Sequence, residues 1–177
     1  MASVILSVSG SDRPGLTQAL AGAVLAAGGN WLESHLSRLG GLYVGSVLVA
    51  LEADRLEDLR AAVQAVDAEG LEVRIAPAAA EEAVGAVGAA GEALQLSLVG
   101  QDRPGIVRRV SEVLSGLSVN IEAFQTRIGA EPQTGAALFH LEARLRLPAG
   151  LSADAVQAAL EDISAEIMVD TALTAAA

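Results

Sequence analysis

Apolar residues recur along this chain with two different periods, and these periods follow one another in the same order in each half. In the first half, apolar and β-branched residues over 3–9 predict a strand, and apolar residues at helical spacing over 16–27 predict a helix. The pattern then predicts two more strands, a second helix and a last strand. These lie at 30–39, at 42–51, between Asp54 and Gly70, and at 71–75.

Glycines and one acidic residue mark the ends of these elements. Gly28 and Gly29 end the first helical pattern, and the Gly40-Gly41 pair is typical of a hairpin between two strands. Asp54 stands three residues before Glu57, which is the spacing of a capping box with Asp in place of Ser or Thr. We therefore expect the second helix to begin at Asp54.

The second half repeats this order. The apolar face of its first helix consists of Ile106, Val107, Val110, Val113, Leu114 and Leu117. Its third strand alternates most clearly, with Phe139, Leu141, Ala143, Leu145 and Leu147 on a buried face and His140, Glu142, Arg144 and Arg146 on a solvated face. A longer turn at 129–135 precedes that strand, and we expect a final helix over 151–163 and a closing strand near 166–171.

The element order predicts an α+β protein of two ferredoxin-like βαββαβ domains. This order gives an antiparallel four-stranded sheet with two helices on one face. We place the first domain at 1–77, an Ala/Gly/Glu-rich linker at 78–91 and the second domain at 92–173. The two sheets either stay separate or join edge to edge into one eight-stranded sheet, which would leave no exposed edge at the join.

A short motif appears at the same place in both halves, ninety residues apart. The first copy reads Leu6-Ser7-x-x-Gly10-x-Asp12-Arg13-Pro14-Gly15, and the second reads Leu96-Ser97-x-x-Gly100-x-Asp102-Arg103-Pro104-Gly105. An Asn follows each Asp after 18 residues, at Asn30 and Asn120. The chain is therefore a duplication of one structural unit.

A strand ending in Gly, then Asp-Arg-Pro-Gly opening a helix, then Asn at the next strand, resembles an ACT domain. The two copies together resemble the stand-alone tandem ACT proteins grouped with the glycine cleavage system transcriptional repressor. This resemblance implies that a small amino acid, glycine or serine, binds where two ACT domains meet. It makes ligand-binding candidates of Asp12, Gly15, Asn30, Asp102, Gly105 and Asn120.

The motif also has the chemistry for such a ligand. A helix start has free backbone N–H groups and a partial positive charge that hold a carboxylate, and Pro14 and Pro104 suit a first turn because they lack an N–H. The Asp and Asn side chains supply acceptors for an ammonium group if they converge. The alternative is purely structural, because an Asp before Pro-Gly is also typical of a helix N-cap and an Asn often closes a turn.

Trp31 distinguishes the two copies. It follows Asn30, where the family more often has a smaller aliphatic residue, so its indole would fill its own pocket or close an interface. Ile121 occupies this position in the second copy. The second copy is therefore the better candidate for a binding site.

Charge and composition narrow the partners. Eleven Lys plus Arg against 22 Asp plus Glu give a net charge of −11, which would repel nucleic acid. The chain has no Cys, no basic leader and no apolar stretch of membrane-spanning length, so we expect a cytoplasmic protein that does not bind membranes. Its two histidines, His35 and His140, have no second ligand at metal-binding spacing, and we expect no metal or cofactor.

Two ACT units use up the length and leave no catalytic domain, so we expect no enzyme activity. The leading interpretation is an amino-acid-sensing regulator that acts on a protein such as a transcription factor, in control of glycine or one-carbon metabolism genes. The alternatives are an assembly module that binds no ligand and a regulatory subunit of a separate amino-acid biosynthetic enzyme. The resemblance also implies a homodimer.

Overall fold

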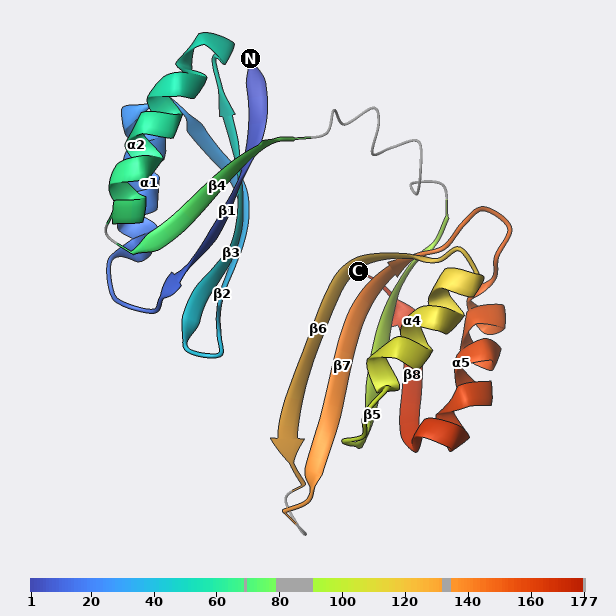
Figure 1. Ribbon diagram of the computed structural model, residues 1–177. Helices are drawn as coiled ribbons and strands as arrows, with labels where there is room; N and C mark the ends of the chain where they lie inside the picture. Colours follow the sequence, from blue (N-terminus) through green and yellow to red (C-terminus); the bar gives the residue numbers. More distant parts are fainter. Residues whose placement is uncertain (69, 79–90, 132–134, 177) are drawn as a thin grey trace. The chain divides into compact units, whose positions relative to one another are not determined.

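The computed structural model describes residues 1–68, 70–78, 91–131 and 135–176. The chain divides into two compact units, Met1–Ala80 and Glu81–Ala177, and each is described by itself (Figure 1). The predicted linker at 78–91 lies almost wholly outside the described residues, as does the middle of the predicted turn at 129–135, and the predicted domain limits stay predictions.

The first unit has the predicted order of strands and helices. Its sheet has the strand order β2-β3-β1-β4 with every neighbouring pair antiparallel. The elements are β1 (Ala2–Ser11), α1 (Leu16–Ala26), β2 (Asn30–Leu39), β3 (Leu42–Leu51), a 3₁₀ turn (Ala53–Arg55), α2 (Leu56–Ala68) and β4 (Leu71–Pro77).

The second unit has the equivalent sheet, in the order β6-β7-β5-β8. Its elements are β5 (Ala93–Gln101), α4 (Ile106–Gly116), β6 (Asn120–Ala130), β7 (Ala137–Arg146), α5 (Ala153–Ile167) and β8 (Val169–Ala175). The predicted fold of two ferredoxin-like units is confirmed. Within the described residues the strands form two four-stranded sheets, one in each unit, and the edge-to-edge joining into eight strands stays a prediction.

Each core lies between one face of the sheet and the two helices, which cover that face alone (Figure 1). The inward residues of β7 are those predicted from alternation, and Leu141 and Leu145 are fully buried. Burial of these side chains supplies most of the driving force for folding of each unit. The opposite sheet face carries the other residue of each alternating pair and is the open face of the unit.

Two helix boundaries differ from prediction. The second helix does not begin at a capping box: Asp54 lies inside the 3₁₀ turn, and α2 begins at Leu56. The last helix runs to Ile167, four residues past the predicted end, since it stops only where Met168 takes a left-handed conformation (φ 54°). The closing strand therefore begins at Val169 rather than near 166.

Both edge strands share one irregularity. The pairing of β2 with β3 shifts between Trp31 and Glu33, and that of β6 with β7 shifts between Ile121 and Ala123. One extra residue, Leu32 or Glu122, is therefore accommodated as a bulge at the same place in each unit. Among the described helices, none is long and apolar enough to cross a membrane.

Candidate functional site

The motif turns have nearly identical backbones in the two units. Gly15 (φ 94°) and Gly105 (φ 97°) are the helix N-caps, both in the left-handed region that glycine adopts without a steric penalty. The first intrahelical hydrogen bonds run from the N–H of Ala19 to the Gly15 carbonyl (2.9 Å) and from that of Arg109 to the Gly105 carbonyl (3.0 Å). The N–H groups of the intervening residues have no helical acceptor and are available to an anion.

The motif aspartates do not cap these helices. No side chain caps either helix start, and Pro14 and Pro104 precede the N-cap rather than occupying the first turn. Instead, the backbone N–H of Asp12 donates to the Gly41 carbonyl and that of Asp102 to the Ala137 carbonyl, each at 3.3 Å. The interpretation of Asp12 and Asp102 as structural N-caps is therefore wrong, and these bonds tie each turn to the neighbouring hairpin.

Side-chain contacts around the two aspartates differ. In the first unit, the Asp12 carboxylate pairs with Arg38 Nε at 3.2 Å, and Thr17 Oγ1 lies 2.7 Å from Tyr43 Oη beside the helix start. In the second unit Ile128 stands in the place of Arg38. Within the described residues the Asp102 carboxylate has no ion pair, in contrast to that of Asp12.

A cavity of about 450 Å³ lies at the start of α4. Its walls are Arg103, Pro104, Gly105, Ile106, Arg108, Arg109, Glu112 and Ile167. Glu112 is its only acidic wall and pairs with Arg108 Nε at 2.8 Å and Arg109 Nη1 at 3.9 Å. Three arginines against one glutamate give the walls of the cavity a net positive charge.

Three of these cavity residues were missed by sequence reasoning. Arg108, Arg109 and Glu112 follow Gly105 by three, four and seven residues, which places them on one side of a helix that starts there. That spacing was a signal available in the sequence. Their counterparts in α1 are Gln18, Ala19 and Gly22, which are uncharged.

The structure does not bring the motif and the Asn together within a unit. Asn30 pairs with Ala50 on β3, whereas Ser11, next to Asp12, pairs with Leu42. Leu42 and Ala50 are eight residues apart, or roughly 26 Å at about 3.3 Å per residue. By the same register, Asn120, opposite Arg146, lies equally far along the sheet from Gln101, which precedes Asp102. No small amino acid touches both ends of one unit.

Asn30 lies beside a second cavity, of about 330 Å³, at the end of α1. Its walls are Thr17, Ala21, Val24, Leu25, Gly29, Asn30 and Trp31. Trp31 is half-buried, packs against the core and forms one wall. The indole was expected to fill its pocket. It instead forms one wall of this cavity and leaves space beside it.

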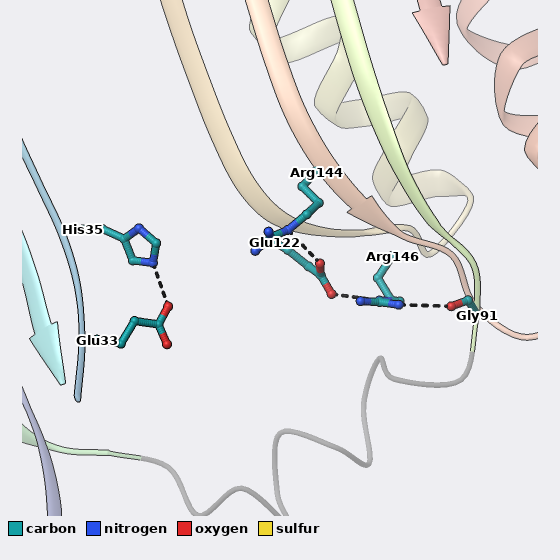
Figure 2. A network of polar contacts seen from close by, with 6 residues as sticks. All are labelled: Glu33, His35, Gly91, Glu122, Arg144 and Arg146. Carbon is teal, nitrogen blue, oxygen red and sulfur yellow. Dashed lines mark hydrogen bonds and ion pairs between the residues drawn. The ribbon is translucent and has the colours of Figure 1, made fainter. Parts of the chain in front are cut away.

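The bulge residue Glu122 organises a polar cluster near Asn120 (Figure 2). Its carboxylate lies 2.9 Å from Arg146 Nε and 3.2 Å from Arg144 Nε, and Arg146 Nη1 donates to the Gly91 carbonyl at 3.4 Å. The Arg146 hydrogen bond, with the positive charges of both arginines, lowers the pKa of the Glu122 carboxyl against a smaller opposing effect of burial. The cluster thus links β6 to β7 through Glu122 and links β7 to Gly91, which precedes β5.

In the described part of the chain, no group of three or more His, Asp or Glu side chains gathers. His35 is 79% exposed and its Nε2 lies 3.1 Å from Glu33 Oε1 on the same strand (Figure 2).

Comparison with known proteins identifies the first unit. Residues 2–76 match the sequence model of the ACT domain. The second unit repeats the element order and the sheet order of the first, so the chain has a tandem ACT-like fold.

Two solved structures have this tandem fold over almost their whole length. An unknown protein from Galdieria sulphuraria is 28% identical, with a TM-score of 0.85 and coverage of 99% of both chains. A "putative glycine cleavage system transcriptional repressor" is 13% identical, with a TM-score of 0.68, and the match covers 98% of this chain and 96% of that one. Comparison with curated proteins gives no match.

Proposed function

We propose that this chain is a regulatory protein that senses a small amino acid and acts through a protein contact rather than by catalysis. The observation that carries the proposal is the cationic cavity at the start of α4, which is built on a helix start with a glycine N-cap. ACT domains are regulatory units, and the fold of both halves supports a regulatory role.

The cavity suits an amino acid in one orientation. The ligand carboxylate accepts hydrogen bonds from the free N–H groups that follow Gly105 and forms ion pairs with Arg108 and Arg109. The ammonium group binds the Glu112 carboxylate, whereas Asp102 precedes Arg103 in the chain and is not among the walls. Gly105 has no Cβ, and even an added one would meet no atom within 4 Å, so the ligand reaches the backbone unhindered.

The other candidate residues have smaller roles in this proposal. Asp12 is paired with Arg38, so we propose that the Gly15 turn is the weaker site. Asn30 and Asn120 are too far from the turns of their own units to share a ligand with them. Each would contribute to binding only at its own end of the sheet.

We propose glycine or serine as the ligand and genes of glycine and one-carbon metabolism as the target. Support for this pathway comes from the name of one structure with the same tandem fold. A net charge of −11 favours a protein, such as a transcription factor, over DNA as the direct contact. We propose a cytoplasmic homodimer, for which light scattering is the test.

Calorimetry of the full chain against the free amino acids tests the proposal. We expect glycine or serine to bind, and the amide of the same amino acid to bind more weakly because it lacks the carboxylate. The R108Q/R109A variant, which installs the residues of α1, should weaken binding about tenfold, or 1.4 kcal/mol. Asp102→Ala should weaken it less.

The matched control is Q18A/T17A at the start of α1, which we expect to leave the affinity unchanged. The sensor proposal fails if no amino acid binds at millimolar concentration. It also fails if amide and acid bind equally, because a helix-start carboxylate contact requires them to differ.

A further inference from the structure

The helix-covered face of the second unit leaves apolar side chains exposed along its edge strand β6. Phe124 stands opposite Ala143 and Ile128 stands opposite Phe139, so both lie on the face that the core uses. They are nevertheless 37% and 56% exposed. β6 is an outermost strand of its sheet (Figure 1), and the helices leave these two side chains partly uncovered.

Val107 on α4 extends this apolar strip and is 41% exposed. Val107 and Phe139 hold the positions of Thr17 and Tyr43 in the first unit, whose hydroxyl oxygens lie 2.7 Å apart. By this equivalence Val107 lies over Phe139, which pairs with Ile128. Exposed apolar side chains from a helix and a strand thus border one sheet edge, and such a patch is typical of a surface that meets another protein.

The first unit has a polar version of the same strip. Ser34 and Arg38 occupy the positions of Phe124 and Ile128, and the Arg38 side chain pairs with Asp12 of its own unit. The two sheets have the same strand order with either set of residues. The apolar strip of the second unit is therefore not required by the fold.

The outer edge of β6 has free backbone groups. Within the second unit β6 pairs only with β7, so alternate residues point their N–H and C=O groups away from the sheet. The bulge at Glu122 interrupts this row at one end and leaves 123–130, which pairs regularly with β7, as the available edge. An extended segment can add here as a further strand through main-chain hydrogen bonds.

Arg127 sets the charge of such a segment. It stands opposite His140 on the open face, and it makes no ion pair within the part of the chain that the structure describes. A residue added opposite Arg127 on the outer side would lie about 4.5–5.5 Å away between Cβ atoms, where an opposite charge attracts. Because side chains alternate along a strand, acidic residues would face the Arg127 side and apolar residues the Phe124 side.

We propose that the outer edge of β6 binds an extended segment of a partner protein in which apolar and acidic residues alternate. The apolar residues contact Phe124, Ile128 and Val107, and an acidic residue pairs with Arg127. This inference rests on the proposed function only in that the chain acts through a protein contact, and it needs no amino-acid ligand. The same edge of a second copy is a poorer occupant, because 123–130 includes no acidic residue.

Amide NMR of the isotope-labelled full chain, titrated with short synthetic peptides, tests the proposal. The probe alternates Val and Glu, and two comparison peptides replace every Glu by Lys or every Val by Ser. We expect the Val/Glu peptide to shift the amides of 123–130 but not those of 33–39 on β2, and the other two to bind at least about threefold more weakly. Since the chain has a net charge of −11, general attraction would favour the Lys peptide, so a preference for Glu reports the local contact.

Variants that install first-unit residues separate the two contacts. Arg127→Ser, which takes the residue of Ser37, should abolish the preference for Glu over Lys. Phe124→Ser should weaken the Val/Glu peptide at least about threefold, because less apolar surface is buried. Both side chains are exposed, so the remaining spectrum should stay folded. Ser37→Ala on β2 is the matched control and should change neither result.

The proposal is overturned if the β6 amides do not shift up to about 5 mM Val/Glu peptide. It is also overturned if the Lys peptide binds equally, or if Arg127→Ser leaves the preference unchanged. Occupation of the edge by a second copy would overturn it too: light scattering would then show a dimer that Phe124→Ser dissociates and that the peptide does not displace. Failure of amino-acid binding in calorimetry would contradict the sensing part of the proposed function and leave this surface unaffected.

Discussion

The starts of α1 and α4 have the same backbone and different surroundings. Their N-cap glycines differ by 3° in φ, and the first helical hydrogen bonds differ by 0.1 Å. Around that shared turn, the first unit places an Asp12–Arg38 pair, and the second places a cavity with three arginines. Duplication has kept what folds the turn, and the outer side chains have diverged.

The open sheet faces of the two units also share a backbone and differ in their side chains. At the bulge, the first unit has Leu32, and Leu48 and Ala50 occupy the positions of Arg144 and Arg146. In the second unit Glu122 binds both of these arginines. The fold tolerates either arrangement, because both bulges occur at the same step of the strand. Exchanging residues between equivalent positions therefore tests which differences the backbone permits.

The largest effect is expected where the backbones themselves differ. Gly45 occupies the position of the buried Leu141, and a Cβ at Gly45 (φ 152°) would overlap the backbone carbonyl of His35. Gly45→Leu should destabilise the first unit by more than about 3 kcal/mol in urea denaturation. As the control, Leu141→Ala leaves a cavity and should cost about 2–5 kcal/mol without separating the strands. If the Gly45→Leu variant were as stable as the wild type, the prediction would be wrong, because β2 and β3 would then have moved apart to accommodate the side chain.

Substitutions at the two motif turns should lower stability less than Gly45→Leu, and by the same amount in each unit. Gly15→Ala and Gly105→Ala each force a side chain into the left-handed region, but the added Cβ meets no atom within 4 Å. Each substitution should therefore cost about 1–2 kcal/mol of unfolding free energy from backbone strain alone. Gly22→Ala on the exposed face of α1 is the control and should stabilise slightly. Clearly unequal costs for the two turns would contradict their structural equivalence.

Replacing Glu122 by Leu, the residue at this position in the first unit, should lower the free energy of unfolding by about 0.5–1 kcal/mol at neutral pH. Because the folded-state pKa of Glu122 is lowered, its contribution is complete above the ordinary value of about 4.5 and disappears as pH falls through the lowered value. The wild-type and E122L stabilities should therefore converge in acid. Parallel curves from about pH 3 to 7 would refute this role for the carboxylate.

The smallest effect is expected on the surface of α4. Arg108→Gln installs the residue of α1 and removes the 2.8 Å pair with Glu112. An exposed pair at i,i+4 contributes about 0.3–0.5 kcal/mol, so thermal unfolding should shift only slightly and the difference should vanish in high salt. A loss above about 1 kcal/mol would mean that Arg108 also holds the helix start in place.

Much of the fold could be predicted because the apolar pattern and the glycines act locally. The hairpin strands at 30–39 and 42–51 coincide with β2 and β3, since Gly40 and Gly41 leave only one place for the turn. The end of α5 could not be predicted, because Met168 adopts a left-handed conformation that its residue type does not favour.

The candidate site could be predicted only in part. The two Asp-Arg-Pro-Gly turns were found from their sequence, but the separation of Asp102 from Asn120 depends on the pairing of β5 with β7 and of β7 with β6. The different surroundings of Asp12 and Asp102 likewise depend on cross-strand neighbours, as Arg38 shows. Contacts between strands distant in sequence carry this information.

The shared bulge also bears on how the protein avoids aggregation. β2 and β6 are edge strands, and a long flat edge is a template for pairing with strands of other molecules. An extra residue near the start of each edge increases the local twist and interrupts the row of free backbone groups. Deleting Leu32 or Glu122 should therefore flatten that edge and increase aggregation of the protein.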